Sequence, residues 1–494
     1  MQRTTAMLAL SVLTLGCATV GDEPSRGFQT LDTRIGKLTF ENSFENGVPT
    51  AETADLLFNE SDFQRATQAY IWAIPIVSFY EWMNGHHDVW KTEQGQLVLQ
   101  ATYRQKLGGL TYNTATPYLI GFLSLDAGPV VIEIPSEDLR GAVHNMWQIG
   151  KGQMTKPGKH VVHKAAEHSP ELEGATAIAM DTNDFFIGLR LMSPDADVRK
   201  QRIVQIQENV TDLEGRRLTE RATFLVDVGI DHKQPRGLKY WRVLHQAINA
   251  NPVHERDRMM MDMLAPLGIA KGKPFEPTDR QKKILEEAAL IGEAMAKNID
   301  FNKTGRLAQS EYGGEGNAWE IATAATPDQK RDHGMDLDGR AAWFYEAVTN
   351  DIAMHGMVNG GWGQVYLDNY YSGDKNSGLD GGKYYTLRIA EPDVYAELFW
   401  NITVYNVENR AIIANEQGRA DVGSNVPDTV YNKDGSVTFH FAPTQPERAS
   451  DANWIQTNPG ENWFVYFRAY SPKPEFVAQE PKTILPNFEL VNTP

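Results

Sequence analysis

The sequence predicts a mainly β fold with helical insertions, in which two β-sandwich or jelly-roll domains are joined by a helical segment. The 494 residues exceed what one ordinary hydrophobic core supports, so two domains are expected. Runs with the period-2 alternation of strands, dense in aromatic and β-branched residues, gather before residue 235 and after residue 366. The strands do not alternate one by one with helices, which favours antiparallel sandwiches over a parallel sheet.

The amino-acid composition limits the classes of molecule that the protein can bind. The chain carries 47 Lys and Arg residues against 64 Asp and Glu residues, a formal net charge of -17. A surface this acidic repels nucleic acid and anionic lipid headgroups, and the sequence holds no basic cluster interleaved with aromatics. We therefore expect no nucleic-acid partner. The hydrophobic fraction of 41% is that of a folded chain.

Residues 1–17 have the pattern of a lipoprotein signal peptide. Arg3 precedes a short apolar stretch over 6–15, and Cys17, the sole cysteine of the chain, follows Gly16. A thioether to lipid would remove this thiol from redox chemistry and anchor the protein. A plain secretory signal with an incidental cysteine is the alternative, because Thr14 stands where leucine is commoner.

The residues after the cysteine predict where the protein is attached. Ala18 and Thr19 follow rather than Asp, which by resemblance to Gram-negative lipoproteins favours the outer membrane. No later stretch reaches 18 apolar residues, so the lipid is expected to be the sole membrane attachment. We expect a lipid-anchored protein of the periplasm and cell envelope.

A polar tether is expected over 18–60, followed by an N-terminal β domain over 61–235. This domain opens with a helix over 62–90, in which Pro75 should kink or break the helix. Strands are then predicted over 128–135, 185–191 and 223–230.

A helical linker is expected over 236–365. Three helices are predicted between 236 and 299, the second stopped by Gly268 and the third capped by Thr278. A fourth is predicted over 338–354.

The C-terminal β-sandwich domain is expected over 366–494. Its predicted strands are 384–390, 398–406, 435–442 and 463–471, because these segments alternate apolar and polar residues. Asn432 to Gly435 should form a hairpin turn, since glycine supplies the positive φ that such turns need.

Short motifs in both β regions are shared with a known tandem family. In the first region they read 113–118 (NTATPY), 128–135 (GPVVIEIP), Arg140 and Trp147; in the second, 379–381 (LDG), 399–405 (FWNITVY), 434–436 (DGS), 453–454 (NW) and 468–472 (RAYSP). The chain resembles proteins that carry domain of unknown function 1254 followed by domain of unknown function 1214. The resemblance covers about 60–485 and implies two jelly rolls, often in ring-like homo-oligomers. It implies no assigned activity.

This chain departs from the first family pattern at two positions. The family's Asp is Ala115 here and its Leu is Pro117. Any chemical role of that Asp in relatives is therefore in doubt for this chain.

A ligand-binding set is predicted from the motif positions. It combines aromatic and hydrogen-bonding side chains and comprises Asn113, Tyr118, Trp147, Trp400, Asn453, Trp454 and Arg468. The alternative is that most of the aromatics belong to the sandwich cores. A site between the domains is expected, because clefts form readily there.

Glu81 is the candidate catalytic residue. It stands between Tyr80 and Trp82, and burial among aromatics would raise its pKa and suit it to general acid catalysis. The alternative is a solvated helix end. Motifs of serine hydrolases, zincins, P-loop and Rossmann proteins are absent from the sequence, and His160 and His163 would face opposite sides of a strand.

Asp374, Asn376 and Asp380 have the alternating oxygen spacing of a calcium loop, with Gly378 between them. The usual late bidentate Glu is missing, and the alternative is a plain turn. No other cofactor is predicted.

Two functions remain open. The leading hypothesis is an envelope hydrolase or binding enzyme that acts on a small or carbohydrate-like substrate in an interdomain cleft. The alternative is a non-catalytic, oligomeric surface or ligand-binding protein. Two carboxylates, or a carboxylate and a histidine, in one buried pocket would favour the enzyme.

Overall fold

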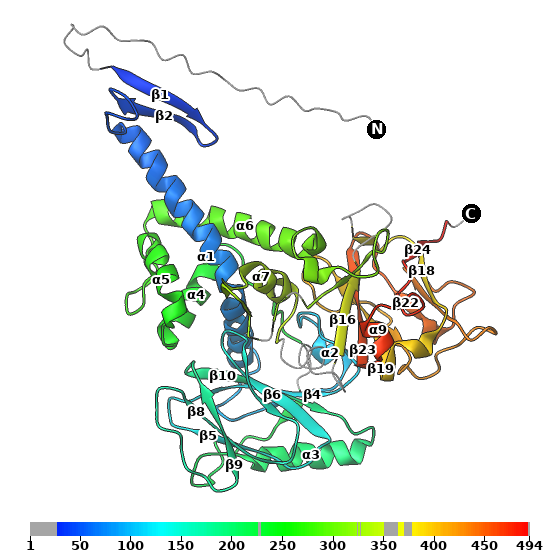
Figure 1. The fold of residues 1–494 in the computed structure, drawn as a ribbon. Helices are drawn as coiled ribbons and strands as arrows, with labels where there is room; N and C mark the ends of the chain where they lie inside the picture. The colour runs from blue at the N-terminus through cyan, green and yellow to red at the C-terminus, as the bar shows by residue number, and fades with distance from the viewer. Residues whose placement is uncertain are drawn as a thin grey trace. The chain divides into compact units, whose positions relative to one another are not determined.

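A computed structural model describes residues 27–225, 229–323, 325–326, 328–349, 364–369 and 378–492. The chain divides into two compact units, 1–61 and 62–494. Figure 1 shows the course of the chain, and each unit is described by itself.

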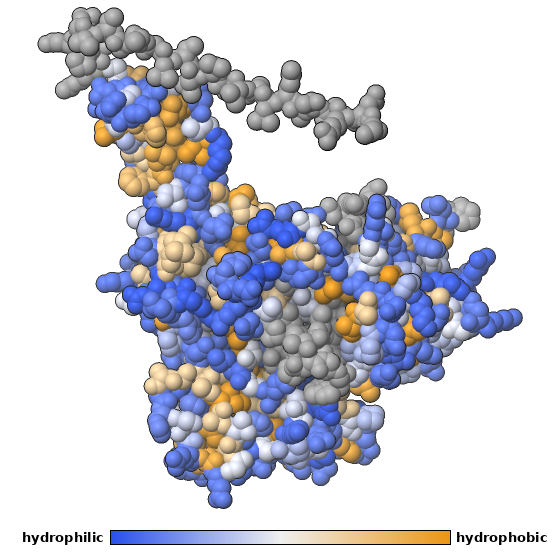
Figure 2. Space-filling view, in the orientation of Figure 1, coloured by the Kyte–Doolittle hydropathy of each residue, from blue (hydrophilic) through white to orange (hydrophobic). Residues whose placement is uncertain are grey.

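The first unit contains an antiparallel hairpin. It pairs β1 (Phe28–Thr33) with β2 (Gly36–Glu41), and Gly36 adopts a φ of +121° at the turn. The sequence predicted a tether here, because the alternation of this stretch is short and largely polar. Figure 2 shows apolar surface on this unit, where Phe28, Phe44 and Phe58 are exposed.

Helix α1 (Ala51–Asp88) begins earlier than predicted and continues through Pro75 without a break. Proline removes one main-chain donor from a helix, so contacts from neighbouring segments must stabilise the helical turns around Pro75. Side chains donate to the carbonyls on either side: Tyr240 to Tyr70, Arg340 to Trp72 and Gln148 to Pro75. The expected break is therefore wrong.

The N-terminal domain is a sandwich of two sheets. The six-stranded sheet has the order β12-β3-β4-β10-β6-β7 and the four-stranded sheet the order β11-β5-β8-β9. Their strands are β3 (Val98–Gln100), β4 (Tyr118–Ser124), β5 (Val130–Ile134), β6 (Leu139–Asn145), β7 (Gly150–Met154), β8 (Gly158–Lys164), β9 (Ala175–Met180), β10 (Asp184–Leu191), β11 (Val210–Thr211) and β12 (Phe224–Leu225). Helices α2 (Tyr103–Lys106) and α3 (Ala196–Glu208) complete the domain.

The two faces of the six-stranded sheet pack against different partners. One face meets the four-stranded sheet in a core that contains Ile132, Val143 and Ile187. On the other face, Phe122 and Phe186 pack against Phe79 of α1, with ring centroids 5.6 and 5.2 Å apart. This second face contributes one wall of the site described below.

The middle segment is helical, as predicted. It comprises α4 (Leu238–Ala250), α5 (Arg258–Leu264), α6 (Asp279–Phe301) and α7 (Leu337–Glu346). Thr278 caps α6 in a capping box, and Gly268 is left-handed after α5, which confirms both end signals. Helix α7 ends before the predicted residue 354.

The C-terminal domain is a second sandwich. One sheet has the order β13-β16-β23-β19-β20, with β17 also paired to β23, and the other the order β22-β21-β18-β24. The strands are β13 (Trp319–Ile321), β16 (Gln364–Asn369), β17 (Leu379–Asp380), β18 (Tyr385–Ile389), β19 (Ala396–Asn406), β20 (Asp421–Gly423), β21 (Val437–Ala442), β22 (Trp454–Gln456), β23 (Asn462–Pro472) and β24 (Glu489–Leu490). Strand β13 lies within the segment that was predicted as linker.

The mainly β fold with helical insertions is thus confirmed, and most predicted strands are present. Pairing is largely antiparallel, although β8 runs parallel to β9 and β21 parallel to β22. Gly435 has a φ of +84° in the predicted turn. Of the predicted strand 223–230, β12 covers two residues, and 226–228 lie outside the described part. Among the helices of the described residues, none is both long and apolar enough to cross a membrane.

Candidate functional site between the two sandwiches

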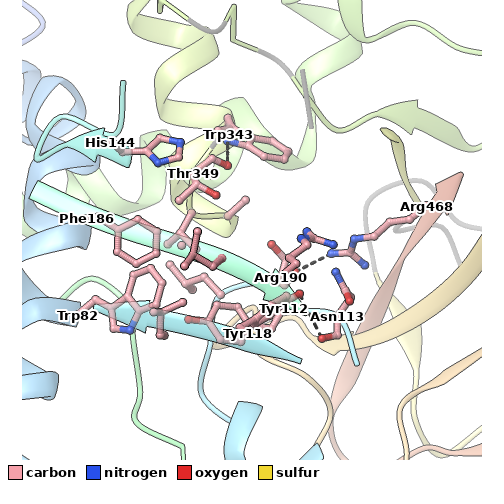
Figure 3. Close-up of a pocket in the computed structure, with 17 residues that line it drawn as sticks. Trp82, Tyr112, Asn113, Tyr118, His144, Phe186, Arg190, Trp343, Thr349 and Arg468 are labelled. Carbon is pink, nitrogen blue, oxygen red and sulfur yellow. Dashed lines mark hydrogen bonds between the residues drawn. The ribbon is translucent and has the colours of Figure 1, made fainter. Parts of the chain in front are cut away.

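A cavity of about 90 Å³ lies where the two sandwich domains and α7 meet (Figure 3). Most of its lining is apolar or aromatic, and its polar residues come from both domains. The described lining consists of Trp82, Leu110, Thr111, Tyr112, Asn113, Tyr118, Ile120, His144, Phe186, Gly188, Leu189, Arg190, Trp343, Ala347, Val348, Thr349 and Arg468.

One end of the cavity is aromatic. Figure 3 places Trp82, Phe186 and His144 there, and the Trp82 and Phe186 rings lie 4.8 Å apart. Trp82 and Phe186 meet because α1 packs on β4 and β10. The result is an apolar surface that suits a flat or branched hydrophobic group.

Two hydrogen-bond donors in the lining have no partner in the described part of the chain. They are the Tyr112 hydroxyl and the Trp82 indole N–H, and both residues are buried. Burial also raises the pKa of Tyr112, so that its hydroxyl stays protonated and able to donate. Buried donors almost always have an acceptor, so this pair marks a place for a ligand or water.

The other end of the cavity is basic. Arg190 and Arg468 lie there beside Asn113 in Figure 3. The Arg190 guanidinium stands 5.3 Å from the centre of the Tyr118 ring, and the Lys106 ammonium 4.0 Å from it. Burial lowers the pKa of Lys106, and the charge of Arg190 lowers it further.

The strand registers explain how these side chains meet. Arg190 of β10 lies directly opposite Tyr118 of β4, so both project from the same face of the sheet. On β23, alternation places Arg468 on the face away from the sandwich core, next to Tyr405 of β19, whose hydroxyl accepts from Arg468 at 2.6 Å. Arg468 also donates to the Thr111 carbonyl at 2.6 Å.

Of the predicted ligand-binding set, Asn113, Tyr118 and Arg468 line this cavity. The structure places the other four elsewhere. Trp147 packs on Trp72 with ring centroids 4.9 Å apart, and Trp400 stacks on Phe467 in the C-terminal sandwich. Asn453 and Trp454 bond to the main chain at Val430 and Ala442.

The remaining predicted site residues also lie away from the cavity. Glu81 forms an ion pair with Lys239 and is not part of the lining. Asp380 accepts from the Gly382 N–H at 2.8 Å, as in a polar turn, whereas Asp374 and Asn376 lie outside the described residues. Cys17 also lies outside them.

Several lining residues had no sequence prediction. The signal for Arg190 was present, because an arginine inside the apolar run FFIGLRL is unusual. His144 and Trp343 carried no comparable signal, and neither did Lys106, which lies behind the lining, since their positions depend on packing between distant segments.

A second buried polar cluster lies between α6, α7 and β16. The Lys303 ammonium lies 2.6 Å from Asp368, 3.2 Å from Asp300 and 3.3 Å from Glu320. Carboxylate oxygens of Asp300, Glu346 and Asp368 all lie within 4.8 Å of one another, a spacing that could hold a cation. In this cluster the Lys303 ammonium already supplies the positive charge.

The pKa values in this cluster follow from burial and from its charges. Burial raises the pKa of Asp300 to about 7, against the attraction of Lys303. Burial alone would lower the pKa of Lys303, but the attraction of Asp300 and Asp368 outweighs it and raises the pKa. The cluster therefore keeps Lys303 charged and brings the pKa of Asp300 close to neutral pH.

The fold and cavity define a two-sandwich protein with a buried site at its domain junction. The family profile described as protein of unknown function DUF1254 matches residues 96–212, and that described as protein of unknown function DUF1214 matches 363–474. The two profiles match in tandem and in this order, which confirms the resemblance drawn from the motifs.

One solved structure supports the fold. The VPA0106 protein from Vibrio parahaemolyticus is similar, with a TM-score of 0.54 and 17% identity over 87% of this chain and 100% of that chain. An uncharacterised protein from Burkholderia cenocepacia has a TM-score of 0.37 and 11% identity over 88% of this chain and 96% of that chain. None of the curated proteins compared with the chain matches it.

Proposed function

We propose that this protein binds a small molecule with an apolar body in the cavity between its two sandwich domains. The observation that carries the proposal is the pair of buried donors, Trp82 and Tyr112, that face no acceptor in the described part of the chain yet line a cavity. A ligand or its water would supply that acceptor. The aromatic wall favours a ring or branched alkyl group over a sugar, which needs more hydrogen-bonding partners.

The same geometry supports binding better than hydrolysis. General acid–base cleavage needs a carboxylate or a comparable pair of titratable groups at the reacting atoms. The described lining contains His144 but no carboxylate, and Glu81 is held by Lys239 outside it. Homo-oligomerisation stays a prediction from the family resemblance.

Binding can be tested by filling the cavity. Val348 lines it, so Val348→Phe adds a ring where the ligand would lie. Val204→Phe makes the same change on the exposed side of α3 and serves as the control. We expect small aromatic compounds to raise the melting temperature of the wild type and of Val204→Phe but not of Val348→Phe. Equal shifts in all three proteins would contradict a site in this cavity.

We also propose that the protein acts in the cell envelope, attached by lipid at Cys17. The support is the signal-like N-terminus and the lone cysteine at its end. Mass spectrometry of the mature protein should show that residues 1–16 are removed and that Cys17 carries acyl chains. Cys17→Ser should abolish the modification. An unmodified Cys17 in the membrane fraction would rule the anchor out.

A further inference from the structure

The basic end of the cavity collects three cationic side chains from distant parts of the chain. Arg190 comes from β10, Arg468 from β23, and Lys106 from α2 directly behind them. Two of them, Arg190 and Arg468, line the cavity itself. Lys106 and Arg468 are buried and Arg190 is partly buried, so three cationic side chains that repel one another share one place.

Neutral oxygens accept hydrogen bonds from two of these cations, Lys106 and Arg468. Lys106 donates to the main-chain carbonyls of Asn113 and Thr116 at 2.8 and 2.6 Å. Arg468 donates to the Thr111 carbonyl and to the Tyr405 hydroxyl. Carbonyl and hydroxyl oxygens satisfy hydrogen bonds but offset only part of a full charge.

One nearby carboxylate, Asp421 of β20, interacts with several cations at once. It accepts a hydrogen bond from Thr114 and feels the charges of Lys106, Arg419 and Arg468. Burial raises the pKa of Asp421, whereas the Thr114 hydrogen bond and these cations lower it. Arg190 and Arg468 both line the cavity, so an incoming anion would meet two guanidinium groups next to the aromatic wall.

We propose that the ligand of this cavity carries a carboxylate that binds beside Arg190, with its apolar body against Trp82 and Phe186. The planar guanidinium fork matches a carboxylate, and the cation–π contact with the Tyr118 ring helps to position Arg190. This inference rests on the proposed binding function and adds the charge of the ligand to it. Arg468 has a positioning role in addition, because its hydrogen bond to the Thr111 carbonyl connects β23 to that segment.

Benzoate and benzamide form a matched pair of probes, because they share the ring and a planar head group and differ in charge. Their affinities for the purified full-length protein would be measured by ligand-observed NMR. The wild type should bind benzoate at least about tenfold more tightly than benzamide, the range of a charge-assisted hydrogen bond. Arg190→Gln should lower that ratio by about tenfold, through weaker benzoate binding alone. Arg190→Lys should keep most of the preference.

Arg242→Gln, on the exposed face of α4, controls for the loss of one positive charge and should leave the ratio unchanged. Equal affinity of the wild type for both probes would overturn the inference, as would an equal loss for both probes in Arg190→Gln. Failure of the binding function looks different: neither probe binds the wild type, or Val348→Phe binds benzamide as the wild type does.

Discussion

Below the aromatic end of the cavity, two histidines pack against Trp82. The His232 ring lies 4.6 Å from the Trp82 ring and the His86 ring 5.9 Å from it. Both imidazoles are buried, and none of their four nitrogens has a hydrogen-bond partner in the described part of the chain. Such groups stay neutral in the folded protein, because a buried imidazolium would lose its hydration without gaining a counter-ion.

This neutrality predicts acid sensitivity. Burial lowers the pKa of His232 to about 3 and holds that of His86 well below its usual value. The unfolded chain takes up these protons below about pH 6.5, whereas the folded chain does not. Stability is therefore lost as the pH falls from about 6.5 towards 3.

The variant His232→Phe tests this at constant ring size. Between pH 7.5 and 5.5 it should lose less stability than the wild type, by about 1.4 kcal/mol. Urea unfolding midpoints at the two pH values give the comparison, and His168→Phe at an exposed site is the control. A pH dependence parallel to that of the wild type would show that His232 has the same pKa in the folded and the unfolded chain.

At the residue scale, the sequence predicted three cavity residues and missed the rest for a definite reason. Asn113, Tyr118 and Arg468 stood in recognisable motifs. Arg190 and Lys106 acquire their role only from strand register and from a short helix, which no local pattern encodes.

At the scale of elements, the packing of α6 on α1 depends on one glycine. A Cβ at Gly292 would lie 2.6 Å from Cγ of Tyr70. Tyr70 has no room to move, since its ring stacks on Tyr240 at 4.0 Å and its carbonyl accepts from the Tyr240 hydroxyl. The close approach of the two helices thus requires the absence of a side chain.

Gly292→Ala should destabilise the protein although alanine favours helix by about 1 kcal/mol. Overpacking a fixed core costs about 1–3 kcal/mol, which outweighs that gain. The melting temperature should fall. Gly305→Ala, where a Cβ meets open space, should change it little. A rise in melting temperature for Gly292→Ala would mean that α6 can shift away from Tyr70.

The elements themselves were predicted unevenly. Strand β18 alternates over its full length and β21 over most of it, and β23 is a long run of aromatic and apolar residues, so these strands could be predicted. The start of α1 was missed because residues 51–61 follow a stretch rich in Glu, Asp and Thr. The effect of Pro75 was misjudged because contacts from α4, α7 and Gln148 stabilise the surrounding turns, and these are long-range.

At the scale of the whole molecule, the two sandwiches are joined by main-chain contacts as well as side chains. The Thr111 N–H donates to the Arg410 carbonyl at 2.8 Å, and Leu110 forms a β-bridge with Ala411. The Tyr405 hydroxyl adds a bond to the Tyr112 carbonyl at 2.6 Å. These contacts between 110–112 and 405–411 form a seam that joins the two domains, and the cavity depends on this seam. The sequence could not reveal the seam, since the contacting residues lie about three hundred positions apart.

Tyr405→Phe should therefore act on the molecule as a whole. It removes the bond to Tyr112 and leaves Arg468 without one acceptor, at a cost of about 1–3 kcal/mol. Differential scanning calorimetry should show a lower and broader transition as the domains become less coupled. Tyr395→Phe, a buried tyrosine within the C-terminal sandwich, is the matched control. The same broadening in both variants would argue against the seam as the cause.

The seam also determines whether the two domains can be separated. The segment 110–114 belongs to the DUF1254 match yet completes its hydrogen bonds on the DUF1214 half. Expressed alone, either half would expose a broken β-bridge, buried cations and one bare wall of the cavity. The two domains thus behave as one structural unit. A chimera that exchanges one half must also exchange the residues of the other half that contact it.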